Sequence, residues 1–382
     1  MTGPGYCGQC GAKLHGRELG GLCHQCVGRG VLATGGRSDR LLETKTPAPR
    51  GGVLGPSSEE VLGAMIGPYR LRERLGEGGM GVVYLAEQEQ PVRRRVALKL
   101  IKVGRDTRSV LARFEAERQA LALMEHPHIA RVFDVGSTAT ATGRPYIVME
   151  LVCGLKITAH CDEHQLSTRD RLVLFVLVCQ AIEHAHHKGI IHLDLKPSNI
   201  MVTVHEGAPI PKIIDFGIAK AIAQKLEDKE LYTEFQALVG TPAYMSPEQA
   251  DLSTADIDAR SDIYALGVLL YQLLIGQTPF DGKDLLAAGF DEMRRTILEK
   301  EPIRPSTRLS TFKGEKLAAT ARRRSTDARN LILLLEGDLD RIVMKCLEKD
   351  RAGRYDTVNG LAMDLNRYLA NEPLVARRLS PL

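Results

Sequence analysis

The chain has 382 residues, of which 44% are hydrophobic and 26% charged, with a formal net charge of +4. These values are typical of globular proteins, and the length predicts two or three domains. The small net charge gives no reason to expect nucleic-acid binding. The sequence contains no apolar run near the ~20 residues that cross a bilayer, and its start has no basic and apolar signal pattern. We therefore expect a cytoplasmic protein without a membrane segment.

Composition divides the chain into four zones. Residues 1–30 are rich in Cys and Gly, and residues 31–66 mix Gly, Pro, Ser and charge without a period, as flexible linkers do. A long globular segment follows at 67–372, and 373–382 is expected to be a C-terminal tail.

The first zone has the cysteine spacing of a zinc site. Its two pairs, "CGQC" and "CHQC", give C-x₂-C-x₁₂-C-x₂-C, and tetrahedral Zn²⁺ is held by four thiolates at such spacings. The expected ligands are Cys7, Cys10, Cys23 and Cys26. His15 or His24 could replace one ligand, and a redox pair or free thiols are the alternative to a metal. The segment resembles small zinc ribbons. A protein partner, nucleic acid or a purely structural part would each fit it, although its few charges and single aromatic residue argue against nucleic acid.

Strand patterns precede helical ones in the globular segment. Period-two or β-rich runs occur in "YRLRERLG", "GVVYLAEQ" and "RRVALKLIKV", followed by a helical stripe in "SVLARFEAERQALALM" and two more strands. Beyond Cys161 helices dominate, at 167–188, about 259–276, 284–300, 336–348 and 357–370. The order predicts an α+β protein with a small β-rich part before a larger helical part.

A glycine-rich turn joins the first two strand-like runs. In Gly76-Glu77-Gly78-Gly79-Met80-Gly81 the missing side chains let backbone N–H groups approach phosphate oxygens. Alone, this pattern also fits an ordinary glycine-rich hairpin. Because it joins strand to strand, it does not indicate a Rossmann dinucleotide site.

The next candidate is Lys99, which ends "VALK" on a strand-like run. A half-buried ammonium requires a counter-charge, because an unpaired buried charge is costly. We expect Glu117 on the following helix to supply it, with Glu115 and Glu125 as competitors.

Two later stretches carry groups suited to phosphoryl transfer. In "GIIHLDLKPSN", Asp194 can accept or orient a hydroxyl proton, Lys196 can neutralise phosphoryl charge, and Asn199 can hold a metal ion. "DFG" follows an apolar strand and places the carboxylate of Asp215 where Mg²⁺ could bind. Each stretch alone could be a surface loop, but their order and spacing make coincidence negligible.

The chain resembles the eukaryotic-like Ser/Thr protein kinases of bacteria, through "GEGGMGVVY", "VALK", "HLDLKPSN", "DFG", "GTPAYMSPEQA" and "SDIYALG". The resemblance implies a two-lobed fold, with an N-lobe at 67–149 and a C-lobe at 153–372, and protein substrates with Ser or Thr acceptors. It implies ATP and Mg²⁺ or Mn²⁺ as cofactors, with Asn199 and Asp215 as metal ligands, Met149 as gatekeeper and Glu150 to Val152 as hinge. The implied nucleotide contacts are Leu75, Gly76, Glu77, Gly78, Gly79, Met80, Gly81, Val82, Val83, Ala97, Lys99, Met149, Glu150, Val152 and Asp215.

The same resemblance implies structural partners. Glu248 should pair with Arg354, with Arg351 as competitor, and Asp262 should accept backbone N–H groups of the catalytic loop. Where most family members have Trp, two residues after this Asp, the chain has Tyr264, which we expect to be harmless.

Leu193 departs from the family pattern, because most members have Arg before the catalytic Asp. That Arg holds a phosphate on the activation segment, and a leucine cannot. We therefore expect activity that does not depend on a phosphate there, although Tyr232 and Thr233 remain candidate acceptors. The alternative is a nucleotide-binding pseudokinase that uses the zinc ribbon as a docking site for a partner.

Two further clusters have a less specific meaning. His184, His186 and His187 end a predicted helix, and we expect one packed and two solvated side chains in preference to a metal site. "ARRRSTD" at 321–327 is expected to be a solvated insertion, with autophosphorylation at Ser325 or Thr326 as the alternative.

Overall fold

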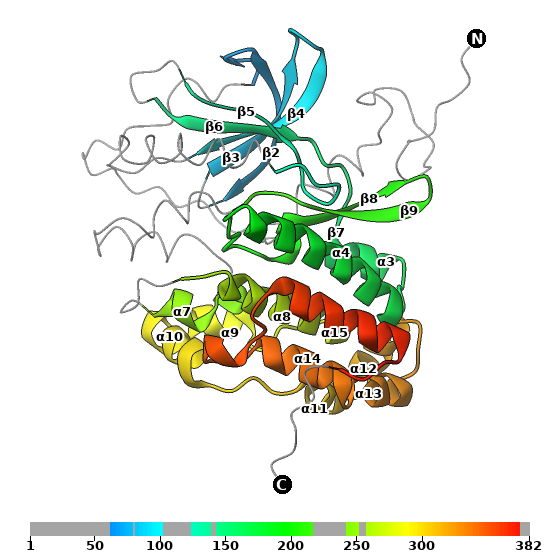
Figure 1. Ribbon diagram of the computed structural model, residues 1–382. Coiled ribbons are helices and arrows are strands. Elements are labelled where there is room, and N and C mark those ends of the chain that lie inside the picture. The colour runs from blue at the N-terminus through cyan, green and yellow to red at the C-terminus, as the bar shows by residue number, and fades with distance from the viewer. Residues whose placement is uncertain are drawn as a thin grey trace, which may run out of the picture.

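The chain folds into a β-rich part and a larger helical part, which lie one above the other in Figure 1. The structure is a computed structural model, and it describes residues 62–78, 81–101, 124–138, 143–216, 242–251 and 257–374. The predicted zinc ligands, the predicted linker up to residue 61, Gly79, Met80, Glu117, Tyr232 and Thr233 lie outside the described residues. The last residues of that linker, Met65–Ile66, form a strand that pairs with the sheet. The small β-rich part before a larger helical part, predicted from the order of strands and helices, is confirmed, and so is the two-lobed fold that the resemblance implies.

The β-rich part is a six-stranded antiparallel sheet in the order β1-β2-β3-β4-β6-β5. Its strands are β1 (Met65–Ile66), β2 (Tyr69–Gly78), β3 (Gly81–Gln88), β4 (Arg94–Ile101), β5 (Val132–Ser137) and β6 (Pro145–Glu150). Alternate side chains of the strands bury a small core in which Leu71, Leu98 and Val148 are fully buried. This core is separate from the main core, which fills the helical part and also includes Ala97 and Ile147 of the sheet.

A small sheet and two helices connect the parts. The sheet has the order β7-β8-β9, with β7 (Leu155–Lys156), β8 (Ile200–His205) and β9 (Ala208–Ile213). Helices α3 (Ile157–Glu163) and α4 (Thr168–His187) lie between β7 and β8 in the chain, and α4 packs on β9. Ser167 begins α4 as an N-cap, because its Oγ accepts the N–H of Asp170.

The remaining helices surround α8 (Arg260–Ile275), which is buried along almost its whole length. They are α7 (Pro247–Ala250), α9 (Gly282–Ala287), α10 (Phe290–Glu299), α11 (Pro305–Ser310), α12 (Gly314–Arg322), α13 (Ala328–Leu335), α14 (Asp338–Cys346) and α15 (Val358–Ala370). At Gly267 an added Cβ would lie 2.5 Å from the Cβ of Cys346, so only glycine permits this approach of α8 to α14. A helix apolar on all sides is typical of such a core position.

Two predictions in this region were wrong. The helix predicted at 284–300 is two helices, α9 and α10, separated at Gly289, whose φ of 85° cannot continue a helix. The stretch 321–327 is not a solvated insertion, because Arg324 is only 2% exposed. Its guanidinium donates to the carbonyls of Leu273 and Leu274 and thereby caps the end of α8.

Candidate active site

The loop at 192–199 is anchored to the first turn of α8. Asp262 is fully buried, and its carboxylate accepts the N–H of His192 at 2.7 Å and of Leu193 at 2.8 Å. Burial raises the pKa of Asp262, but hydrogen bonding and charge from His186 and His192 outweigh it and hold this pKa below its usual value. The prediction that Asp262 anchors the loop through backbone N–H groups is confirmed.

Leu193 is held in an unusual backbone conformation by this anchor. Its φ is 61°, in the left-handed region that a residue with a Cβ rarely adopts, and its side chain is almost fully buried. Its carbonyl accepts the side-chain N–H of Gln249 at 3.0 Å. No sequence pattern pointed to this hydrogen bond, which connects the loop to α7.

His192 is fully buried, and its ring stacks on Phe216 with centroids 4.7 Å apart. Burial lowers its pKa, and the nearby carboxylates of Asp262, Asp194 and Asp215 oppose this only in part. The imidazole is therefore neutral at neutral pH. It joins the loop to the "DFG" stretch by apolar contact.

Asp194, Lys196 and Asn199 converge within this loop. The Nζ of Lys196 lies 2.7 Å from Oδ2 of Asp194. The side-chain N–H of Asn199 donates to the carbonyl of Asp194 at 2.8 Å and to its Oδ2 at 3.2 Å. The spacing of "DLKPSN" thus forms a compact turn that holds one carboxylate, one ammonium and one amide together.

Lys99 and Asp215 meet across the two parts of the fold. Lys99 lies on β4 and Asp215 follows β9, yet the ammonium and the carboxylate form a salt bridge. The Lys99 side chain is 6% exposed and that of Asp215 is 28% exposed. The counter-charge seen for Lys99 is therefore Asp215, whereas the predicted partner, Glu117, lies outside the described residues. Two groups from different parts of the fold are thus in direct contact.

The other predicted nucleotide contacts surround this salt bridge. Strands β2 and β3 form the expected hairpin, in which Gly78 pairs with Gly81. A Cβ at Gly81 would lie 2.2 Å from the carbonyl oxygen of Leu100, so this position requires glycine. Val83 pairs with Lys99 in the sheet. The apolar members Leu75, Val82, Ala97, Met149 and Val152 are each at most 8% exposed.

The predicted ion pair of Glu248 with Arg354 is buried. Arg354 donates to both carboxylate oxygens of Glu248, at 2.7 and 2.8 Å. Burial raises the pKa of Glu248, but the hydrogen bond and charge of Arg354 outweigh this and lower it overall. The predicted pairing is confirmed, and Arg351 pairs with Asp258 instead. Tyr264 replaces the usual Trp and places its ring 5.1 Å from the Arg354 guanidinium.

The histidines at the end of α4 have separate roles. His186 Nε2 lies 2.8 Å from Asp262 Oδ2, and the ring of His184 lies 5.2 Å from that of His126. Only His187 is solvated, with a side chain that is 75% exposed, so the expectation of two solvated histidines was wrong. Among the described residues no His, Cys, Asp and Glu side chains form a metal-binding cluster.

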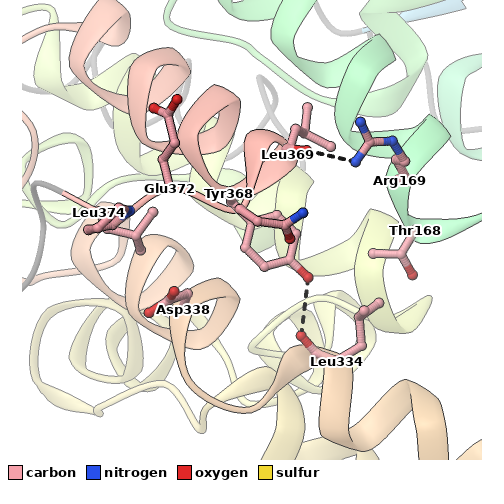
Figure 2. Close-up of a pocket in the computed structure, with 10 residues that line it drawn as sticks. Thr168, Arg169, Leu334, Asp338, Tyr368, Leu369, Glu372 and Leu374 are labelled. Carbon is pink, nitrogen blue, oxygen red and sulfur yellow. Dashed lines mark hydrogen bonds between the residues drawn. The ribbon is translucent and has the colours of Figure 1, made fainter.

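A cavity of about 540 Å³ lies at the far end of the helical part (Figure 2). It is formed where α4 begins and α15 ends, and the guanidinium of Arg169 donates there to the carbonyl of Leu369. None of the residues predicted for the active site lines it. The salt bridge of Lys99 with Asp215 therefore lies outside this cavity.

Comparison with known proteins identifies the fold as a protein kinase domain. The family described as "Protein kinase domain" matches residues 69–365. Serine/threonine-protein kinase PknB of Mycobacterium tuberculosis is 37% identical over 310 residues, which are 80% of this chain and 43% of PknB. Pkn1 of Myxococcus xanthus is 37% identical over 290 residues, which are 75% of this chain and 38% of Pkn1. The chain belongs to the protein kinase domain family.

Solved structures agree on the fold. The kinase domain of M. tuberculosis PknI matches with a TM-score of 0.57 and 24% identity, covering 81% of this chain and 99% of that domain. The chain spans less than half of the length of the PknB and Pkn1 sequences that it matches. Across the described residues, each helix is too short or too polar to cross a membrane.

Proposed function

We propose that this chain is a Ser/Thr protein kinase that transfers the γ-phosphoryl group of ATP to Ser or Thr hydroxyls of protein substrates. The observation that carries the proposal is the salt bridge of Lys99 with Asp215, which joins the two parts of the fold, together with the convergence of Asp194, Lys196 and Asn199 in one loop. Membership of the protein kinase domain family and the identity with PknB and Pkn1, both named as serine/threonine-protein kinases, support it.

The residues of the catalytic loop have distinct proposed roles. Asp194 orients the acceptor hydroxyl and accepts its proton, while Lys196 stabilises charge on the transferred phosphoryl group. Lys196 and the "DLKPSN" pattern favour Ser and Thr over Tyr as acceptors. The protein would act by positioning and electrostatics, with no covalent intermediate on a side chain.

The oxygen atoms near the cleft fit a hard divalent cation. The Asp215 carboxylate and the Asn199 amide oxygen are the ligand types that Mg²⁺ or Mn²⁺ prefers. The Asn199 side chain contacts Asp194, and Phe216, next to Asp215, packs on His192 of the same loop. When bound, the cation would neutralise phosphate charge. Lys99 would then turn from Asp215 to the phosphates, with Glu117 as its proposed second partner.

The hairpin of β2 and β3 is proposed to cover the phosphates of the nucleotide. The strands around Ala97 and Met149 are proposed to contact the adenine. The two residues pair directly in the sheet, so both contribute to one apolar wall. The segment from Glu150 to Val152 would offer its main chain to the base.

We also propose that activity does not require a phosphate on the activation segment. The support is the anchoring of Leu193: its N–H binds Asp262, its carbonyl binds Gln249, and its side chain is buried. A loop held by these contacts has no need of an arginine–phosphate pair. Thr233→Ala should keep most of the turnover on a peptide substrate. A large loss in Thr233→Ala, together with activation of the wild type by phosphate at Thr233, would contradict this proposal.

The N-terminal cysteines are proposed to hold one Zn²⁺ and to present a docking surface for a protein partner. The support is the spacing of Cys7, Cys10, Cys23 and Cys26 alone. Metal analysis should give one zinc per chain in the wild type and less than half of that after Cys23→Ser. A metal-free wild type purified with added zinc would refute it.

A cytoplasmic location is proposed as well, because Cys161, Cys179 and Cys346 are buried thiols, as is typical of proteins in a reducing compartment. Cell fractionation tests this location, and recovery of the chain outside the cytoplasmic fraction would contradict it.

Asp194→Asn separates a working kinase from a nucleotide-binding scaffold. Radiolabelled γ-phosphate should pass from ATP to a protein or peptide acceptor with the wild type, and the rate should fall by about 10³-fold or more in the variant. Both proteins should still bind nucleotide. Nucleotide binding by a wild type that transfers no phosphate would support the pseudokinase alternative.

A further inference from the structure

A salt bridge links the hinge to strand β9. The Nζ of Lys212 lies 2.7 Å from Oε1 and 2.8 Å from Oε2 of Glu150, so the ammonium binds both oxygens of the carboxylate. The side chains are 19% and 28% exposed. A half-buried pair with this geometry constrains its partners more than an exposed pair does.

Glu150 is also hydrogen-bonded to Arg131, on the segment before β5. The N–H of Arg131 donates to Oε2 of Glu150 at 3.2 Å, and the N–H of Glu150 donates to the carbonyl of Arg131 at 2.8 Å. Three contacts from two separate segments therefore fix the position of Glu150.

Strand β9 is tied to the segment before β5 by its main chain as well. The N–H of Ile213 donates to the carbonyl of His128 at 2.8 Å, and the N–H of Ala130 donates to the carbonyl of Ile213 at 2.9 Å. Lys212 therefore lies on a strand that main-chain hydrogen bonds hold in place. Through its ammonium, it can hold the carboxylate of Glu150 in a fixed position relative to that strand.

The location of this pair gives it a consequence for the active site. Glu150 is the first residue of the hinge, and Lys212 lies three positions before Asp215, the proposed metal ligand. The pair thus connects the proposed adenine site to the strand that carries the metal site. Nothing in the sequence patterns pointed to Lys212.

We propose that Lys212 is a positioning residue for nucleotide binding, which acts by fixing the hinge through the carboxylate of Glu150. The inference rests on the proposed function, because it assumes that residues 150–152 contact adenine. Lys212 itself does not touch the reacting atoms. Its loss should weaken nucleotide binding and leave the phosphoryl-transfer step nearly unchanged.

One side of the pair borders a cavity of about 530 Å³, lined by Glu125, His126, Pro127, Arg131 and Phe133 together with the pair itself. A methionine at position 212 therefore has room to adopt a relaxed conformation, and no ammonium is left buried. The substitution Lys212→Met removes the charge and keeps most of the volume, so it tests the ion pair and not the packing.

The experiment compares variants of the full chain. For wild type, Lys212→Met, Lys212→Arg and the control Arg72→Met, we would measure the KM for ATP, kcat on a peptide and the Kd of a fluorescent ADP analogue. Arg72 pairs with Glu87 on β2 and β3 and is not among the proposed nucleotide contacts. Lys212→Met should raise KM and Kd about three- to tenfold while kcat changes less than twofold. Lys212→Arg should recover most of the loss, and Arg72→Met should match the wild type.

Several results would overturn the inference. Unchanged KM and Kd in Lys212→Met would do so, as would a loss confined to kcat. If Lys212→Met fails to fold, Glu150→Gln replaces it, because the amide oxygen can still accept the N–H of Arg131 while the charge is gone. Glu150→Gln is expected to raise KM and Kd by the same factor. A wild type that binds no nucleotide would instead refute the proposed function, so the two failures are distinguishable.

Discussion

The β-rich part and the helical part, here called the β-rich wall and the helical wall of the site, are held by different kinds of contact. On the helical side, buried charged groups fix the catalytic loop and its support, as Asp262, Arg354 and Glu248 do. On the β-rich side, strand pairing supplies the order, and charged contacts such as Arg72 with Glu87 lie at the surface. The groups proposed for catalysis are therefore held by buried charge, whereas the hairpin of β2 and β3 depends on strand pairing and weaker surface contacts.

The largest expected effect is on the buried ion pair. Arg354→Met leaves the Glu248 carboxylate, 10% exposed, with Ser261 as its remaining side-chain partner in the described structure. Breaking one partner of a buried pair costs about 3–5 kcal/mol. Denaturant unfolding should show a loss in this range. A loss below 1 kcal/mol would mean that the helical wall is not held by buried charge.

The next effect concerns the anchor of the catalytic loop. Asp262→Ala removes the acceptor of two buried N–H groups and should destabilise the fold by about 2–4 kcal/mol, since each unsatisfied donor costs about 1–3 kcal/mol. Turnover should also fall by about 100-fold or more, because a small displacement of the loop misplaces Asp194. A stable variant with normal turnover would contradict the anchoring role.

Acid should weaken the helical wall first. The pKa values of Glu248 and Asp262 are both lower in the folded protein than their usual values. Their contribution to stability is therefore present above the unfolded pKa of each group and is lost as the pH falls through the lowered, folded pKa. Unfolding curves taken from neutral pH downwards should show this loss, and it should shrink in Arg354→Met and in Asp262→Ala. Equal acid sensitivity in those variants and the wild type would contradict the assignment.

The smallest effect is expected on the β-rich side. The Arg72 and Glu87 side chains are 43% and 19% exposed, so their salt bridge is screened by water. Arg72→Met should change the free energy of unfolding by less than about 0.5 kcal/mol. A loss near that of Arg354→Met would remove the contrast between the two walls.

Local patterns predicted the elements and the short-range site groups well. The expected helix at 167–188 matches α4, and the turn that gathers Asp194, Lys196 and Asn199 follows from their spacing. Asp262 and the pair of Glu248 with Arg354 followed from family resemblance. These contacts are encoded in short motifs, which a single sequence displays directly.

The remaining features depend on partners far apart in the chain. Arg324 is buried because carbonyls at the end of α8 need donors, and no local pattern shows that need. Lys212 was missed for the same reason, since its partner Glu150 lies on another sheet. The break at Gly289 could have been suspected from the glycine alone, because glycine ends helices more often than it continues them.

The capping of α8 by Arg324 has a consequence for protein engineering. Helix α8 is a rod of ~24 Å, at a rise of ~1.5 Å for each residue. Asp262 near its start carries the catalytic loop, and Arg324 closes its other end. A shortened gene that deletes residues 314–326 would therefore remove more than a surface appendage. It would remove the Arg324 donor from the carbonyl of Leu274 and leave the Leu273 carbonyl with Arg171 alone, at the far end of the helix that anchors the loop.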